Sequence, residues 1–183
     1  MGHIKQIRFC GVGGQGVVLS GTILGHAAIH DEKWVYGADD YGAQARGGSA
    51  ESEVIISNHP IMFPHVIEAD ILVSFSQDAY DKYIQNIDEK GALVIYDDHN
   101  INPGKMNGAQ QISIPAIHTA IHELHTKQVA NIITLGALAG ITGIVSKDAL
   151  IAAIAANVPE RFKEVNLKAV EIGFNLGIQS QHS

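Results

Sequence analysis

The spacing of apolar residues along the chain predicts alternating strands and helices. Short, nearly unbroken apolar runs are typical of strands buried on both faces of a sheet, whereas apolar residues that recur every three or four positions are typical of helices. The expected strands cover residues 4–10, 34–36, 49–57, 70–75, 92–96 and 111–114, and the expected helices cover residues 17–29, 77–84, 116–124, 129–141, 147–156 and 159 onward. This alternation predicts an α/β fold with a mostly parallel sheet flanked by helices, and a helical C-terminal third.

Two details of the helices follow from the same pattern. Ser76 and Ser146 each precede an expected helix, where a serine hydroxyl can accept a hydrogen bond from a free backbone N–H group and cap the helix. The last helix is amphipathic and is expected to bury one face. The residues of that face are Phe162, Val165, Ala169, Ile172 and Leu176.

Length and composition narrow the class of protein. The chain has 183 residues, so residues 1–183 are expected to form a single domain with a substantial core. The net charge is −7 and the 12 Lys and Arg residues are scattered, which argues against a nucleic-acid-binding surface. No apolar run approaches the roughly twenty residues that a membrane span needs, and the N-terminus lacks the apolar core of a signal peptide.

The cysteine count restricts the chemistry further. Cys10 is the only cysteine, which excludes an internal disulfide and fits the reducing cytoplasm. It also excludes an iron–sulfur cluster or a zinc site built on cysteines of this chain alone. Because Cys10 closes an apolar run, we interpret it as a small core residue. The single cysteine leads us to expect a cytoplasmic location for the protein.

A glycine-rich loop joins the first expected strand to the first expected helix. Its sequence is Gly11-Val12-Gly13-Gly14-Gln15-Gly16. Glycines allow positive φ angles and a close approach of another group. The helix that follows directs its unpaired N–H groups and the positive end of its dipole at the loop. Such a loop favours an anion, most often a phosphate.

Two other interpretations of this loop remain open. Gly11, Gly13 and Gly16 match the dinucleotide-binding pattern G-x-G-x-x-G, which is weak alone. That pattern also needs an acidic residue at the end of the second strand, for which Asp39 and Asp40 are the candidates. Equally, the glycines can serve only to let the first helix pack tightly on the sheet. The loop is not a P-loop, because no Walker lysine follows it.

A second glycine-containing stretch, residues 38–48, is expected to form a surface loop. Arg46 precedes Gly47 and Gly48, and its planar guanidinium suits a carboxylate or a phosphate. Tyr41 adds an aromatic ring and a hydroxyl group. A simple turn is the alternative, but loops held on a scaffold often carry function, so we interpret this one as a contact surface.

The sequence predicts no catalytic and no metal-ligating residues. His118, His122 and His125 share one helix face with Glu123 beside them, which superficially suggests a metal site. Metal sites, however, gather ligands from several elements, and the H-E-x-x-H spacing is absent. We therefore expect these histidines to be solvated. A G-x-S-x-G nucleophile signature is also missing.

Several of these segments together resemble a known family. The two glycine stretches, at residues 11–16 and 41–48, are followed by Ser-Glu-Val-Ile-Ile-Ser at 52–57, an apolar segment at 69–77 and Val-Ala-Asn-Ile-Ile-Thr-Leu-Gly-Ala at 129–137. In this order they resemble the γ subunit of 2-oxoacid:ferredoxin (acceptor) oxidoreductases. The likeness spans nearly the whole chain, and the combination of both glycine motifs is specific.

The second glycine motif also bears on the substrate. Tyr-Gly-x-x-Ala-Arg-Gly-Gly is more similar to 2-oxoglutarate enzymes than to pyruvate enzymes, while indolepyruvate enzymes share the first motif and the Arg-Gly-Gly ending. Asp40 stands where similar chains often have a small polar residue, and Ala43-Gln44 replaces a frequent Pro-Glu. The alternatives are therefore the γ subunit of a pyruvate, branched-chain 2-oxoacid or indolepyruvate oxidoreductase, or a free-standing dinucleotide-binding domain.

The resemblance implies a division of labour. Enzymes of this family use thiamine diphosphate with Mg²⁺ to decarboxylate a 2-oxoacid, pass electrons through [4Fe-4S] clusters and form an acyl-CoA. It implies that these cofactors lie on α, β and ferredoxin-like δ partner subunits, and that the γ subunit alone has no turnover. Coenzyme A (CoA) is the candidate ligand of the glycine loops, with an assembly role without any ligand as the alternative. The expected site residues are Gly11, Gly13, Gly14, Gln15, Gly16, Tyr41, Arg46, Gly47 and Gly48.

Overall fold

The computed structural model describes residues 4–42, 48–88, 91–105 and 108–181. The strands are β1 (Lys5–Val12), β2 (Trp34–Tyr41), β3 (Ser49–Ser57), β4 (Ile71–Ser74), β5 (Leu93–Tyr96) and β6 (Gln110–Ser113). The helices are α1 (Val17–His30), α2 (Gln77–Tyr83), α3 (Ala116–His122), the 3-10 turn η1 (Lys127–Val129), α4 (Ala130–Thr142), α5 (Lys147–Asn157) and α6 (Glu160–Ser180). The elements follow the expected alternation closely.

The strands form one sheet in the order β2-β3-β1-β4-β5-β6. β1, β4, β5 and β6 are parallel neighbours, and β3 runs antiparallel between β1 and β2. Within the described residues, β3 alone opposes the direction of the other strands, so the prediction of a mostly parallel sheet is confirmed.

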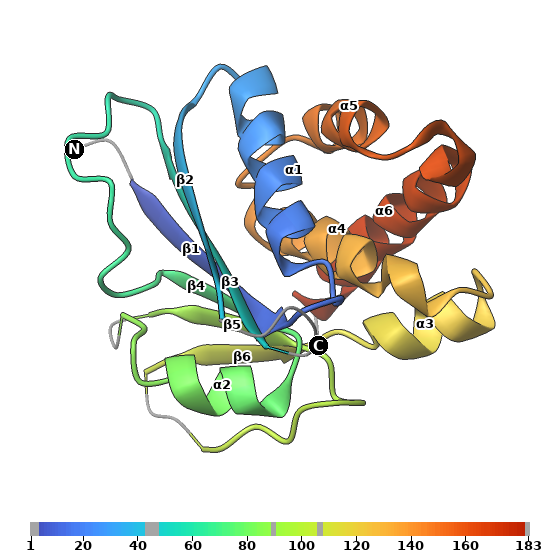
Figure 1. The fold of residues 1–183 in the computed structure, drawn as a ribbon, viewed down its shortest axis with the longest axis horizontal. Coiled ribbons are helices and arrows are strands. Elements are labelled where there is room, and N and C mark those ends of the chain that lie inside the picture. Colours follow the sequence, from blue (N-terminus) through green and yellow to red (C-terminus); the bar gives the residue numbers. More distant parts are fainter. Residues whose placement is uncertain (1–3, 43–47, 89–90, 106–107, 182–183) are drawn as a thin grey trace.

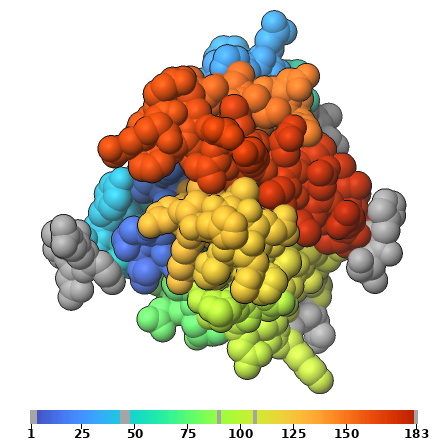
Figure 2. Space-filling view, turned by 90° about the vertical axis from the view of Figure 1, so that its right-hand side faces the viewer, coloured from blue at the N-terminus to red at the C-terminus, as the bar shows by residue number. Residues whose placement is uncertain are grey.

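Helices cover the two faces of the sheet unequally. Figure 1 shows α1 and α3 to α6 on one face and α2 on the other. The larger core lies under the first group, where Ile7 and Phe9 of β1 meet α1 and α4, and a smaller core lies under α2 around Leu72 and Tyr80. The C-terminal third forms most of the helical side in Figure 2. No helix in the described ranges is long and apolar enough to cross a membrane.

Ser76 and Ser146 cap α2 and α5 as expected. The Ser76 hydroxyl accepts a hydrogen bond from the N–H of Ala79 at 3.4 Å, and the Ser146 hydroxyl accepts one from Ala149 at 3.2 Å. These short polar side chains replace two of the missing hydrogen bonds at the helix starts.

One expectation about the fold is wrong, and another holds only in part. β2 runs to Tyr41 rather than ending at residue 36, because it pairs with β3 along its whole length in spite of the low strand propensity of Gly37 and the aspartates. The stretch at 38–41 is therefore strand, not loop. On α6, Ala169 is buried and Val165 and Leu176 pack against the core as expected, but Phe162 is 45% exposed. The other buried positions include Val170, Gly173 and Gly177.

The shifted face of α6 has a steric cause. A Cβ atom at Gly173 would collide with the carbonyl oxygen of Ile133, and one at Gly177 with that of Ala137. The backbones of α4 and α6 thus touch directly, which only glycine permits. The amphipathic pattern of larger residues could not reveal a contact made by residues without side chains.

Candidate functional site

A pocket of about 200 Å³ lies beside the carboxyl ends of β1, β4 and β5. Its lining residues are Gly14, Gln15, Phe75, Asp97, Asn100, Ile117, Lys127, Gln128, Ala130, Asn131 and Thr134. From β1 the chain passes to one side of the sheet, and from β4 it passes to the other. Ligands of α/β proteins bind at such switch points, so the pocket has the expected location for a ligand.

Gln15 holds the glycine loop in shape. Its Oε1 accepts a hydrogen bond from the backbone N–H of Val12 at 2.8 Å, and its Nε2 donates one to the carbonyl of Phe75 at 2.8 Å. The side chain therefore bridges the ends of β1 and β4 across the switch point. Both ends of its amide are used within the chain, so the contribution of Gln15 to a ligand is the fixed conformation of the loop.

The glycines of this loop divide into two kinds. A Cβ atom at Gly11 would lie 2.6 Å from Oε1 of Gln15, and one at Gly16 would lie 2.7 Å from Cγ of Asn131. Gly14 has a φ of 97° and its Cβ would meet nothing within 4 Å. Gly13 is exposed. The packing interpretation thus fits Gly11 and Gly16, whereas Gly14 leaves backbone open to a ligand in the pocket.

This division can be measured with one substitution. Gly16→Ala is expected to lower the free energy of unfolding by about 2–4 kcal/mol, because it combines a left-handed backbone, with φ of 75°, and a clash with Asn131. Gly14→Ala is the matched control, since it has positive φ without a clash and should cost only about 1–2 kcal/mol. Urea unfolding followed by circular dichroism gives both values. Equal losses would show that the Asn131 contact is not tight.

The structure brings the two glycine motifs together. The N–H of Gly13 donates a hydrogen bond to the carbonyl of Gly48 at 2.9 Å. Tyr41 ends β2 and is 65% exposed, but it does not line the pocket. Arg46 and Gly47 lie outside the described residues, so their role stays a prediction. Within the described residues, the hydrogen bond to Gly48 is thus the link between the loop at 11–16 and the second glycine stretch.

Lys127 and Asn131 belong to the site but were not predicted from the sequence. Lys127 starts η1 and lines the pocket, and its ammonium forms no ion pair with any residue that the structure describes. Asn131 is 4% exposed, and its Nδ2 donates to the carbonyl of Gly16 at 3.3 Å and to the hydroxyl of Ser20 at 3.4 Å. In the sequence, Asn131 is part of the segment at 129–137 and Lys127 lies just before it. That segment carries no recognisable chemistry, so neither residue could be identified from it.

Asp97 fixes the pocket wall where β5 ends. Its carboxylate accepts hydrogen bonds from the N–H of Ile117 at 2.6 Å and from the N–H of His99 at 2.9 Å. Burial raises the pKa of Asp97, and these two N–H donors partly oppose the rise. The carboxylate thereby positions the start of α3, which supplies Ile117 to the pocket.

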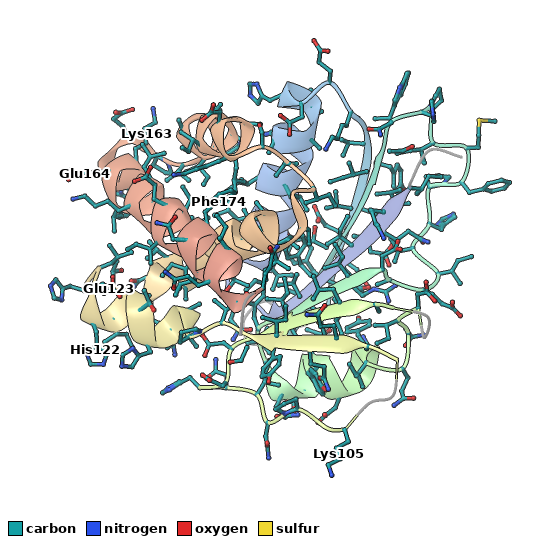
Figure 3. All side chains as sticks on the ribbon, turned by 180° about the vertical axis from the view of Figure 1, so that it is seen from behind. Lys105, His122, Glu123, Lys163, Glu164 and Phe174 are labelled. Atoms are coloured by element: carbon teal, nitrogen blue, oxygen red, sulfur yellow. The ribbon has the colours of Figure 1, made fainter. Side chains whose placement is uncertain are left out.

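The histidines and the cysteine contribute no reactive group to the pocket. His118 and His122 place their ring centroids 4.3 Å apart, and Figure 3 shows His122 with Glu123 at the outer end of α3. No cluster of three or more potential ligands for a metal ion exists among the described residues. Burial raises the pKa of the Cys10 thiol to about 12, so it stays protonated and unreactive at neutral pH.

Known proteins show extended similarity to this chain. The family model described as pyruvate ferredoxin/flavodoxin oxidoreductase matches residues 6–176. The 2-oxoglutarate synthase subunit KorC of Methanocaldococcus jannaschii is 45% identical over 94% of this chain and 93% of that protein.

Solved structures show the same fold. The γ subunit of a keto/oxoacid ferredoxin oxidoreductase from Geobacter sulfurreducens has a TM-score of 0.84 at 37% identity, covering 96% of this chain and 99% of that chain. A 2-oxoglutarate:ferredoxin oxidoreductase from Magnetococcus marinus, solved with 2-oxoglutarate, coenzyme A and succinyl-CoA bound, has a TM-score of 0.87 at 25% identity. The match covers 96% of this chain but only 31% of that one.

Proposed function

Because the chain belongs to the pyruvate ferredoxin/flavodoxin oxidoreductase family, as a γ subunit similar to KorC of 2-oxoglutarate synthase, we propose that its complex converts 2-oxoglutarate to succinyl-CoA and that its pocket holds part of CoA. The substrate proposal is supported by the names of the relatives, and the CoA proposal by the ligands of the Magnetococcus enzyme. Pyruvate, branched-chain 2-oxoacids and indolepyruvate are the competing substrates.

The observation that carries the CoA proposal is that Lys127 and the open backbone of the glycine loop line one pocket. Gly14 and Lys127 line the same pocket, and the start of α1 has no side-chain cap. A phosphate group of CoA would find a cation, backbone N–H groups and the positive end of a helix dipole there. The donor set of these residues fits an anion.

The pocket can hold only part of so large a ligand. With a volume of about 200 Å³ it is smaller than the usual site for a drug-sized molecule. We therefore assign to this chain the binding and orientation of one end of CoA, with the remainder extending over partner subunits. Thiamine diphosphate with Mg²⁺, bound on the α and β subunits, would supply the decarboxylation chemistry. Clusters on the β and δ subunits would take up the electrons.

The strand order argues against the dinucleotide alternative. In dinucleotide-binding folds, the strand that ends in the acidic residue lies directly beside the first strand. Here β3 separates β2 from β1, and Asp39 and Asp40 both lie on β2. The carboxylate of Asp39 also accepts a hydrogen bond from the Ser52 hydroxyl at 2.6 Å. The acidic side chains are therefore one strand too far from the glycine loop.

The isolated chain is expected to have no turnover. With Cys10 as its only cysteine, it cannot provide the ligands of an iron–sulfur cluster, and it holds only one part of the proposed site. The test is reduction of a viologen dye with 2-oxoglutarate, CoA and thiamine diphosphate. We expect no reduction by the purified chain and activity on addition of the partner subunits, with 2-oxoglutarate preferred over pyruvate. Dye reduction by the chain alone, free of other subunits, would refute the division of labour.

A further inference from the structure

The segment at residues 58–68, between β3 and β4, is held against the sheet by apolar packing and hydrogen bonds. Ile61 and Val66 pack with Ile55 in a small apolar cluster on the face opposite α1. Arg8 donates a hydrogen bond to the carbonyl of Val66 at 3.1 Å, and the N–H of Ile67 donates one to the side chain of Gln6 at 3.2 Å. Figure 1 shows the segment (green) along the side of the molecule remote from α5 and α6.

The segment at residues 58–68 nevertheless exposes several large apolar side chains to solvent. Phe63 is 86% exposed, Met62 78% and Ile67 76%. Trp34 at the start of β2 is 54% exposed, and Ile4 before β1 is 49% exposed. We call these five residues the apolar end surface. Because Ile61 and Val66 already fill the space against the sheet, the exposed side chains cannot turn inward without displacing them.

The five residues belong to one end of the sheet. Trp34 pairs with Ser57, which leads directly into the segment at 58–68. Lys5, which follows Ile4, pairs with Ile56 on the other side of β3. The segment returns to β1 through the hydrogen bond between Ile67 and Gln6. The apolar end surface therefore surrounds the end of β3, at the end of the sheet opposite the pocket.

Its composition is that of an interface core. Aromatic residues and methionine are enriched in protein–protein interfaces, and monomeric proteins rarely expose such groups together. The other large apolar side chains that are exposed within the described residues are distributed over α1, the end of β2, α3 and α6. They are Leu19, Ile29, Tyr41, Ile121, Phe162 and Ile178.

The subunit organisation of related enzymes supplies a candidate occupant for this surface. The chain is a small subunit of a multi-subunit oxidoreductase, and in the Magnetococcus enzyme its equivalent is 31% of one longer chain. In that chain the domain is covalently joined to further protein, which the KorC subunit of Methanocaldococcus jannaschii, matched over 93% of its length, does not contain. A separate subunit that replaces this further protein must be held by a non-covalent interface, whose apolar core has to be exposed on the isolated chain.

We propose that the apolar end surface is the anchor for the partner subunit that corresponds to the remainder of the Magnetococcus chain. Phe63 and Met62, the two most exposed of the five, are expected to make its main contacts, with Trp34, Ile4 and Ile67 adding to them. Because the pocket lies at the opposite end of the parallel strands, this anchor holds the subunit without covering the entrance for CoA. The proposal rests on membership in the complex and is independent of the CoA site.

The test uses the complex expressed with all of its subunits. The double variant Met62→Asp with Phe63→Asp is expected to raise the dissociation constant for the partner at least thirtyfold, or to abolish co-purification. Its unfolding temperature should stay close to that of wild type, because both side chains are exposed. The matched control is Ile121→Asp with Phe162→Asp, which changes two exposed apolar residues elsewhere and should assemble normally.

A second measurement does not depend on substitution. Met62 should be oxidised by hydrogen peroxide in the free chain and at least tenfold more slowly in the complex, as measured by mass spectrometry. Wild-type affinity of the double variant, or equal oxidation of Met62 in both states, would overturn the proposal. It would also fall if the double variant converted a dimer of this chain to a monomer yet still bound the partner, since the surface would then join two copies of this chain. A CoA-site variant that assembles normally leaves the anchor proposal intact. Failure of the CoA proposal can therefore be distinguished from failure of the anchor proposal.

Discussion

Lys127→Glu is expected to raise the KM for CoA about ten- to hundredfold in the assembled complex, with kcat near wild type. A hydrogen bond to a charged group contributes about 1.5–3 kcal/mol, and each 1.4 kcal/mol is tenfold in affinity. Lys127 and Gly14 line the same pocket, and Lys127 has no carboxylate partner among the residues described. Because the phosphate is remote from the reacting thiol, the lost interaction is the same in the ground state and the transition state, so KM changes and kcat does not.

Lys105→Glu provides the control for this measurement. Lys105 is an exposed lysine that does not line the pocket, and Figure 3 shows it on the opposite side of α2 from the helical layer. The two variants change the net charge equally, so long-range electrostatic effects are matched. Steady-state kinetics at varied CoA, together with co-purification, report binding and assembly separately. An unchanged KM for CoA in Lys127→Glu would remove this pocket from the CoA proposal.

The fold could be predicted from the sequence wherever burial was carried by large apolar side chains. The strands at β4 and β5 are such segments, because both faces of each are buried. The prediction failed at the end of β2 and was incomplete on α6, where the missed contacts are made by the backbone. Gly173 and Gly177 touch α4 without side chains, and no periodicity of apolar residues records that contact.

Of the candidate site, only the glycine loop, which is local in the sequence, could be predicted. The loop at 11–16 has a recognisable sequence, and its position before a helix follows from the order of the elements. Which of its glycines pack and which stay open depends on Asn131 and on the residue after β4, both remote in the sequence. Lys127 reaches the pocket only because η1 and α4 return to the end of β1. Such tertiary contacts have no signature in a single sequence.

Arg8→Met is expected to lower the free energy of unfolding by about 3 kcal/mol. The Arg8 side chain is 7% exposed, and its Nη2 and Nε lie 2.5 Å from Oε1 of Glu53 and 2.6 Å from Oε1 of Glu51, respectively. Removal of the guanidinium would leave two largely buried carboxylates facing each other without a cation, which is a costly arrangement. Its Cζ also lies 5.2 Å from the ring centroid of Tyr83, so packing is lost as well.

One further variant separates the charge effect from the packing effect, and another provides an exposed ion pair as a control. Adding Glu51→Gln and Glu53→Gln to Arg8→Met removes the uncompensated charges and should restore part of the stability, because neutral amides are less costly to bury. Lys5→Met breaks the exposed pair with Asp70, whose nitrogen and oxygen are 3.1 Å apart, and should cost less than about 1 kcal/mol. Urea unfolding at pH 7 measures all three.

The same residue connects the core to the proposed anchor. Arg8 donates to the carbonyl of Val66, which holds the segment at 58–68 on the sheet. Arg8→Met should therefore increase amide hydrogen exchange in that segment more than in α4, and it should weaken partner binding beyond the effect of Lys5→Met. If Arg8→Met lost stability but left both exchange in the segment and partner binding unchanged, the buried ion pairs would stabilise the sheet without positioning the apolar end surface.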